Sequence, residues 1–129
     1  MIRHPRRQLV LDAMAPSARL AREFVREILT EGHNPVEHVE DFVLVVSELV
    51  TNAVRYGTEP GDSLLVVLDT DDDRTRVEVH DTARRLPQPK PHSDERGRGR
   101  GLHIVDALAN WGTGTRPLGK YVWAEVEKL

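Results

Sequence analysis

The 129-residue sequence contains no cysteine and only six aromatic residues: two Trp, two Tyr and two Phe. Without cysteine, the chain has no disulfide framework, no thiolate nucleophile and no cysteine-ligated zinc. It also lacks a run of apolar residues long enough for a membrane-spanning helix, so we expect no membrane partner. The basic N-terminus has no apolar core of the kind that a secretory signal carries, and we therefore expect a cytoplasmic protein.

No single sign of charge dominates the chain, which has 18 Lys and Arg against 21 Asp and Glu and a net charge of −3. A balance of this kind argues against direct binding to nucleic acid, which favours strongly basic surfaces. The 39% content of hydrophobic residues is ordinary for a globular protein. We therefore expect residues 1–129 to form a single domain with a substantial core. The six histidines lack the spacing of zinc ligands.

Hydrophobic periodicity predicts the order strand, helix, helix, strand, strand, loop, helix, strand, strand. The expected strands are residues 8–13, 64–70, 75–81, 112–116 and 121–126, and the expected helices are residues 16–31, 36–56 and 102–110. Successive strands adjoin each other in this order, which favours a mostly antiparallel sheet with helices on one face. The expected fold class is α+β, in the form of a two-layer α/β sandwich.

Two segments are expected to be irregular. The aspartates at positions 71–73 are typical of a solvated hairpin turn. Residues 86–98 contain Pro87, Pro89 and Pro91, which exclude regular structure, and the segment is long enough to act as a lid. The first helix is expected to bury an apolar stripe. Its members are Leu20, Phe24, Val25, Ile28 and Leu29.

The second helix combines a strongly apolar back with a polar edge. Glu48 and Asn52 lie four residues apart and therefore share one face, which Arg55 continues for another turn. An Asn oxygen can ligate Mg²⁺, and a Glu can act as a general base on water or a hydroxyl. Spacing alone equally fits an ordinary amphipathic helix. The apolar positions are Phe42, Val45, Val46, Leu49, Val50 and Ala53.

A glycine cluster, G-R-G-R-G at residues 97–101, stands directly before the third expected helix. Glycines allow the backbone to approach an anion, and helix N-terminal N–H groups point towards it. The cluster fits a phosphate cradle, although a flexible basic loop has the same composition. Asp81 ends a strand nearby and could accept a hydrogen bond from the amine of a base, or simply cap a turn. Residues 114–120 nearly match a P-loop, but a strand pattern follows them, where a P-loop requires a helix.

These motifs occur in an order that resembles the ATPase superfamily of gyrase and histidine kinases, the Bergerat fold. S-E-L-V-T-N-A-V-R-Y-G at residues 47–57 is similar to its N box. V-E-V-H-D-T at residues 77–82 and G-R-G-L-H-I-V-D-A-L at residues 99–108 are similar to its two glycine boxes. Together with the closing G-K-Y-V-W-A-E, the chain more narrowly resembles stand-alone ATP-binding regulators of actinobacteria, which belong with the anti-sigma-factor serine kinases.

The resemblance implies ATP and Mg²⁺ as cofactors and assigns roles by position. Asn52 would ligate Mg²⁺, Glu48 would be the catalytic base and Asp81 would bind the adenine amine. Arg55 is expected to contact phosphate. The remaining nucleotide-binding positions would be Ala83, Arg98, Gly99, Arg100, Gly101, Leu102 and Tyr121.

Two positions depart from the family pattern. The first glycine box normally reads Asp-x-Gly-x-Gly, whereas this chain has Ala83 and Arg85 in place of the glycines. The closing strand often carries Thr where this chain has Tyr121, and we expect the phenol to fill part of the adenine pocket. These departures alter positions expected to contact adenine, whereas the residues expected to bind Mg²⁺ and phosphate keep the family pattern.

The resemblance implies a regulator that binds a sigma factor or an antagonist protein, that phosphorylates the antagonist on serine or threonine, and that forms a homodimer. A different class of function is a non-catalytic protein-binding module with a degenerate nucleotide site, which Ala83, Arg85 and Tyr121 favour. The intact pair of Glu48 and Asn52 argues against that module. A detached histidine kinase ATPase domain is a third interpretation, which the absence of a phosphoacceptor helix pair disfavours.

Overall fold

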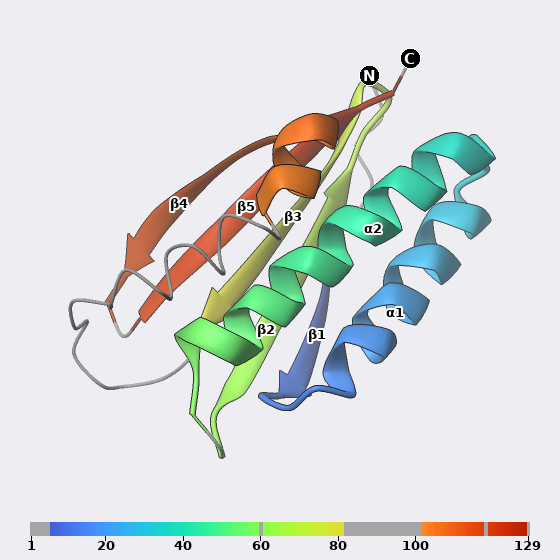
Figure 1. The fold of residues 1–129 in the computed structure, drawn as a ribbon. Coiled ribbons are helices and arrows are strands. Elements are labelled where there is room, and N and C mark those ends of the chain that lie inside the picture. Colours follow the sequence, from blue (N-terminus) through green and yellow to red (C-terminus); the bar gives the residue numbers. More distant parts are fainter. Residues whose placement is uncertain (1–5, 60, 82–101, 118, 129) are drawn as a thin grey trace.

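A five-stranded antiparallel sheet forms one layer of the molecule, and the helices cover one of its faces (Figure 1). The computed structural model describes residues 6–59, 61–81, 102–117 and 119–128. Its elements are β1 (Arg7–Asp12), α1 (Ser17–Glu31), α2 (Val36–Asn52), the π-helix η1 (Ala53–Gly57), β2 (Ser63–Thr70), β3 (Arg74–Asp81), a helix over residues 102–108, β4 (Asn110–Arg116) and β5 (Gly119–Glu127). The predicted α+β two-layer sandwich is confirmed.

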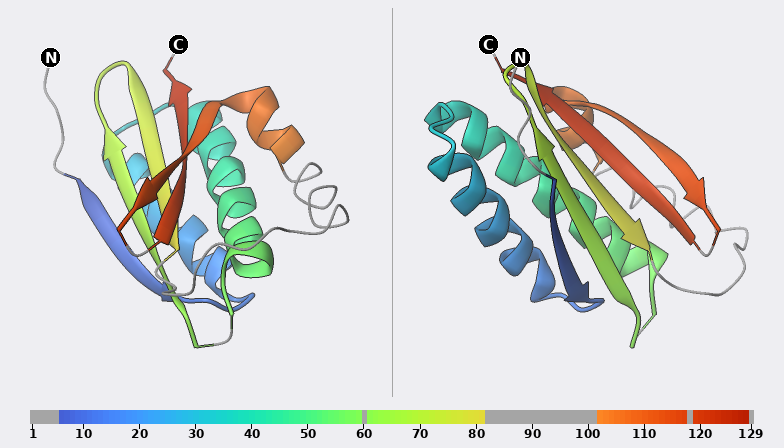
Figure 2. Two further views of the ribbon diagram at one scale, coloured as in Figure 1. Left: turned by 90° about the vertical axis from the view of Figure 1, so that its left-hand side faces the viewer. Right: turned by 180° about the vertical axis from the view of Figure 1, so that it is seen from behind.

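The strands lie in the order β1-β2-β3-β5-β4, and every neighbouring pair is antiparallel. Seen from behind, the sheet lies in front of all the helices, so its second face carries no helix (Figure 2). Side chains alternate between the two faces of a strand. In β3 the buried positions are Thr75, Val77, Val79 and Asp81, which face the helices. Arg74, Arg76, Glu78 and His80 alternate with them on what we call the open face.

The core fills the space between the sheet and the helices. Helix α2 contributes most to it, because Phe42, Val45, Val46 and Val50 are fully buried, as the periodicity predicts. Each such side chain stabilises the fold by about 1.5–3 kcal/mol relative to an exposed one. Val105 of the helix over residues 102–108 is fully buried as well, which fixes that short helix on the sheet beside α2 (Figure 1).

Helix α1 buries most of the predicted stripe, because Val25 and Leu29 are fully buried and Phe24 and Ile28 pack against the core partly buried. The prediction for Leu20 is wrong, since this side chain is 45% exposed, while Ala18, Ala21, Val25 and Leu29 are buried. The first turns of α1 therefore bury the small Ala18 and Ala21 and leave the larger Leu20 towards solvent.

Helix α2 also ends differently from the prediction. The sequence predicts one α-helix over residues 36–56, but the α-helix stops at Asn52 and a π-helix over Ala53–Gly57 follows. A π-turn is wider than an α-turn and is frequent at functional sites. Here it leads the chain to Gly57, which is buried against β3 and β5.

The predicted turns occur as expected. The Asp71 carboxylate accepts hydrogen bonds from the backbone N–H groups of Asp73, at 2.8 Å, and Arg74, at 3.0 Å, and so closes the β2–β3 hairpin. Residues 114–120 belong to the β4–β5 hairpin, which agrees with the rejection of a P-loop. The predicted lid, residues 86–98, lies outside the described residues. None of the helices in the described ranges could serve as a transmembrane span.

A buried polar chain links α2 to the β2–β3 hairpin. His38 is buried, and its Nε2 lies 2.8 Å from Thr75 Oγ1, which in turn lies 3.1 Å from Thr70 Oγ1. Burial lowers the pKa of the His38 imidazole below its ordinary value of 6.5, and the charge of Lys128 acts in the same direction against the weaker effect of Asp41. The folded protein therefore favours neutral His38.

This pKa shift predicts that the protein loses stability in mild acid. The unfolded chain binds a proton on His38 more readily than the folded chain does, so the free energy of unfolding falls as the pH drops below about 6.5 and towards the lower folded-state pKa. Urea unfolding at about pH 8 and about pH 5.5 measures the loss. The loss should shrink in His38→Gln and persist in His103→Gln, because His103 is exposed. An equal loss in His38→Gln would contradict this assignment.

Candidate functional site

A cavity of about 330 Å³ lies between the sheet, the end of α2 with η1, and the helix over residues 102–108. This volume is within the range of small-molecule sites, about 300–1,000 Å³. Its lining is mostly apolar with a few polar groups, which is the usual composition of such sites. The lining residues are Leu49, Asn52, Ala53, Gly57, Val79, Asp81, Leu102, Trp111, Thr113, Gly114, Thr115, Lys120, Tyr121 and Val122.

Asn52 brings an unsatisfied polar group to the cavity wall. Its Nδ2 is buried and makes no hydrogen bond within the described part of the chain. A buried donor without a partner costs about 1–3 kcal/mol, so such a group in a native structure requires an explanation. Asn52 lies in the last turn of α2 and lines the cavity beside Leu49 and Ala53, so its unsatisfied amide nitrogen lies next to the space that a ligand would occupy.

Asp81, Lys120 and Gly57 lie close together in the cavity wall. Asp81 is only 8% exposed and pairs with Lys120 across β3 and β5. A Cβ on Gly57 would lie 3.5 Å from Asp81 Oδ2 and 4.0 Å from Lys120 Cε. The carboxylate and the lysine side chain therefore approach the same point, and the missing side chain of Gly57 leaves that point open.

The other two predicted residues of α2 and η1 lie beside the cavity instead of in its wall. Glu48 is partly buried one turn before Asn52, on the same edge of the helix, and Arg55 is exposed on η1. Neither belongs to the residues that line the cavity. Glu48 is nonetheless the neighbour of Asn52 on the helix surface, because residues four apart lie next to each other.

The expectation that the Tyr121 phenol fills part of the adenine pocket is not met. Tyr121 contributes to the cavity wall, but its ring stacks on His80 at a centroid distance of 4.9 Å, on the open face of the sheet. Its paired residue in β4 is Gly114, where a Cβ would lie 2.6 Å from Tyr121 Cε1. The absence of a side chain at Gly114 thus lets the ring lie across β4, away from the helices. Lys120 and Val122 face the cavity instead.

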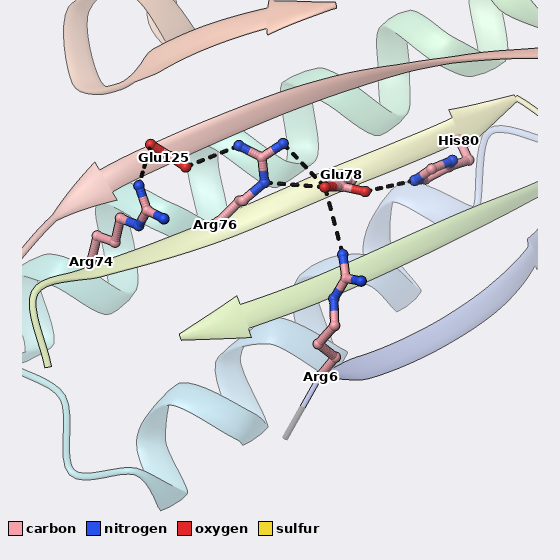
Figure 3. Close-up of polar contacts among 6 residues, drawn as sticks. All are labelled: Arg6, Arg74, Arg76, Glu78, His80 and Glu125. Carbon is pink, nitrogen blue, oxygen red and sulfur yellow. Dashed lines mark hydrogen bonds and ion pairs between the residues drawn. The ribbon is translucent and has the colours of Figure 1, made fainter. Parts of the chain in front are cut away.

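An ion-pair network holds the open face behind the site (Figure 3). Arg76 bonds Glu78 and, at 2.9 Å, Glu125, and His80 Nε2 lies 2.8 Å from Glu78. Arg116 donates to His80 Nδ1 at 3.1 Å, so the proton of a neutral His80 is on Nε2, facing Glu78. Burial alone would raise the pKa of Glu78, but the hydrogen bonds from His80 and Arg76 outweigh it and lower that pKa. The network keeps Glu78 ionised and holds the His80 ring, on which Tyr121 stacks.

The structure thus brings four predicted residues together around the cavity: Asn52, Asp81, Leu102 and Tyr121. The other predicted nucleotide-binding residues lie outside the described ranges, and these are Ala83, Arg98, Gly99, Arg100 and Gly101. Apart from Tyr121, the contributions of β4 and β5 to the cavity were not predicted from the sequence. The residues concerned are Trp111, Thr113, Thr115 and Lys120.

A comparison with protein-family models matches residues 11–123 to the histidine kinase-like ATPase domain. The match spans the chain from the end of β1 to the middle of β5 and includes the whole cavity. The chain belongs to this family. The predicted resemblance to the ATPase superfamily of gyrase and histidine kinases is therefore confirmed. The narrower resemblance to anti-sigma-factor kinases stays a prediction.

The oxygen atoms around the cavity suit the way in which a histidine kinase-like ATPase domain would hold Mg²⁺ together with its nucleotide. Within the described ranges, no group of three or more His, Asp or Glu residues could hold a metal by itself. Mg²⁺ commonly uses one or two protein oxygens together with phosphates and water. The buried amide of Asn52 suits that limited role, since its Oδ1 can ligate the ion while the nucleotide supplies further oxygens.

The unsatisfied amide predicts a stabilising substitution. Asn52→Leu removes the buried donor, and the added volume extends into the cavity, so the free energy of unfolding should rise by about 1 kcal/mol. Asn34→Ala is the matched control, because Asn34 Nδ2 donates to the Leu29 carbonyl at 2.9 Å, and its loss should lower stability by about 1 kcal/mol. Urea unfolding measures both. A loss of stability in Asn52→Leu as large as in Asn34→Ala would show that the amide is satisfied.

The contact between Gly114 and Tyr121 predicts a coupled pair of substitutions. Gly114→Ala should destabilise the protein by about 1–3 kcal/mol, because the new Cβ collides with the tyrosine ring. In a Tyr121→Ala background the same substitution should cost less than about 0.5 kcal/mol, since the obstacle is gone. A double-mutant cycle by chemical unfolding measures the coupling. Equal costs in the two backgrounds would contradict the placement of the ring.

Proposed function

We propose that this chain is an ATP-binding regulator that uses ATP and Mg²⁺ to phosphorylate a serine or threonine of a small antagonist protein. The observation that carries the proposal is the buried Nδ2 of Asn52, which has no partner within the described residues, at the wall of a cavity that also contains Asp81. A family that binds ATP supplies the substrate class. The sigma factor, the antagonist and the homodimer come from the sequence resemblance.

Two polar residues of the cavity wall, Asp81 and Asn52, suit the base and the phosphates of a nucleotide. Asp81, buried at the far end of β3, offers an acceptor to the amine of a base. Asn52 lies at the end of α2 and would hold the phosphates through Mg²⁺, which neutralises charge on them when it is bound. Glu48, one turn further along the same edge, would take the proton of the attacking hydroxyl.

Phosphoryl transfer requires little from the protein beyond the correct placement of these groups. Phosphoryl transfer depends mainly on positioning and on charge stabilisation around an in-line displacement. A rigid helix end that carries the base and the metal ligand at fixed separation meets that need. The exposed position of Arg55 would let it reach an incoming phosphate or protein partner.

Regulation would follow from exchange of partners. In this proposal the same domain holds a sigma factor in one state and the antagonist in another. Phosphorylation of the antagonist releases the antagonist from the domain. The partner surfaces are not assigned. The placement of the Tyr121 ring on the open face removes one of the reasons for preferring a non-catalytic module, because the ring does not block the cavity.

Glu48→Gln tests the catalytic part of the proposal. It should lower phosphoryl transfer from ATP about 10²- to 10⁴-fold, the usual contribution of a general base, while ATP binding is kept. Glu40→Gln is the control on the same helix, because Glu40 is exposed and pairs with Arg26. The assay follows ATP consumption by the purified protein alone and with each candidate antagonist. ATP binding without any consumption by the wild type would support the non-catalytic module instead.

A further inference from the structure

Beside Asp81, the residue proposed to accept a hydrogen bond from the base, the cavity wall also carries a hydrogen-bond donor, Lys120. Lys120 and Asp81 face each other in the β3–β5 register, and both line the cavity. Lys120 Cε and Asp81 Oδ2 lie 4.0 and 3.5 Å from one point above Gly57. The carboxylate and the cation therefore border a single space, which Gly57 keeps open because it has no side chain.

The hydrogen-bonding edges of the purines differ at this position. Adenine presents an amine donor at N6 beside an acceptor at N1, whereas guanine presents an acceptor at O6 beside N–H donors at N1 and N2. A carboxylate alone matches adenine, but it faces guanine O6 with a second acceptor, and sites reject ligands that leave buried polar groups unmatched. A lysine beside the carboxylate supplies the missing donor to O6, while the carboxylate accepts from N1–H and N2–H.

We propose that Lys120 widens the base specificity of this site, so that the chain binds guanine nucleotides as well as adenine nucleotides. The inference rests on the proposed nucleotide site and adds a residue that sets its specificity. The flexible four-carbon stem of lysine lets the ammonium follow either base. With adenine bound it donates to N1 or turns to solvent, and with guanine bound it donates to O6.

The test compares non-hydrolysable analogues of ATP and GTP by calorimetric titration in Mg²⁺. Wild type should bind the two analogues with dissociation constants within about tenfold of each other. Lys120→Met should weaken the GTP analogue about ten- to hundredfold, as expected for loss of a charge-assisted hydrogen bond, and the ATP analogue by less than about threefold. Lys120→Arg, which keeps a cationic donor, should retain binding of both.

Inosine triphosphate isolates the O6 contact, because it keeps O6 and N1–H but lacks the 2-amino group. Lys120→Met should weaken it as much as it weakens the GTP analogue. Thermal melting of each variant verifies that it is folded, and a folded variant is expected because the Lys120 side chain borders an open cavity.

Each other outcome overturns the inference in a distinguishable way. Wild type that binds only the ATP analogue refutes the guanine specificity and leaves the nucleotide site standing. Equal weakening of both analogues in Lys120→Met places the lysine on the phosphates, which the two ligands share. Wild type that binds neither analogue refutes this inference and the proposed function together.

Discussion

The packing of α2 against the sheet is the interaction on which the candidate site depends. Burial of Phe42, Val45, Val46 and Val50 leaves the helix only one orientation, because any rotation would expose part of that face. The polar edge with Glu48 and Asn52 is fixed as a consequence. Hydrophobic burial, which has no directional preference of its own, thereby places Asn52 in the cavity wall and Glu48 beside it, the two residues proposed as metal ligand and base.

The register between β3 and β5 sets the opposite wall. It pairs Asp81 with Lys120 on the helix-facing side and His80 with Tyr121 on the open face. A slip of one residue would exchange these faces. The glycine at position 114 and the ion pairs around Glu78 hold the open face in this register (Figure 3). The residues behind the sheet therefore matter to the cavity although they do not line it.

The sequence alone predicts the element order, the sheet type and the α2 edge, because hydrophobic periodicity and turn composition are local signals. It does not predict the π-turn after Asn52, which depends on packing of Gly57 against two strands that come later in the chain. It also misplaces the Tyr121 ring and misses Lys120, since the side of a strand that faces the helices follows from its register with a distant partner. Leu20 illustrates the same limit in α1, where the small Ala18 and Ala21 are buried and the larger Leu20 is exposed.

Calorimetric titration of the purified protein with ATP, with and without Mg²⁺, decides whether the cavity bordered by Asn52 and Asp81 is a nucleotide site completed by Mg²⁺. Binding should strengthen in Mg²⁺ and be lost in Asn52→Ala, while the variant remains folded. Absence of binding at millimolar ATP, or binding that is indifferent to both Mg²⁺ and Asn52, would contradict that role for the cavity.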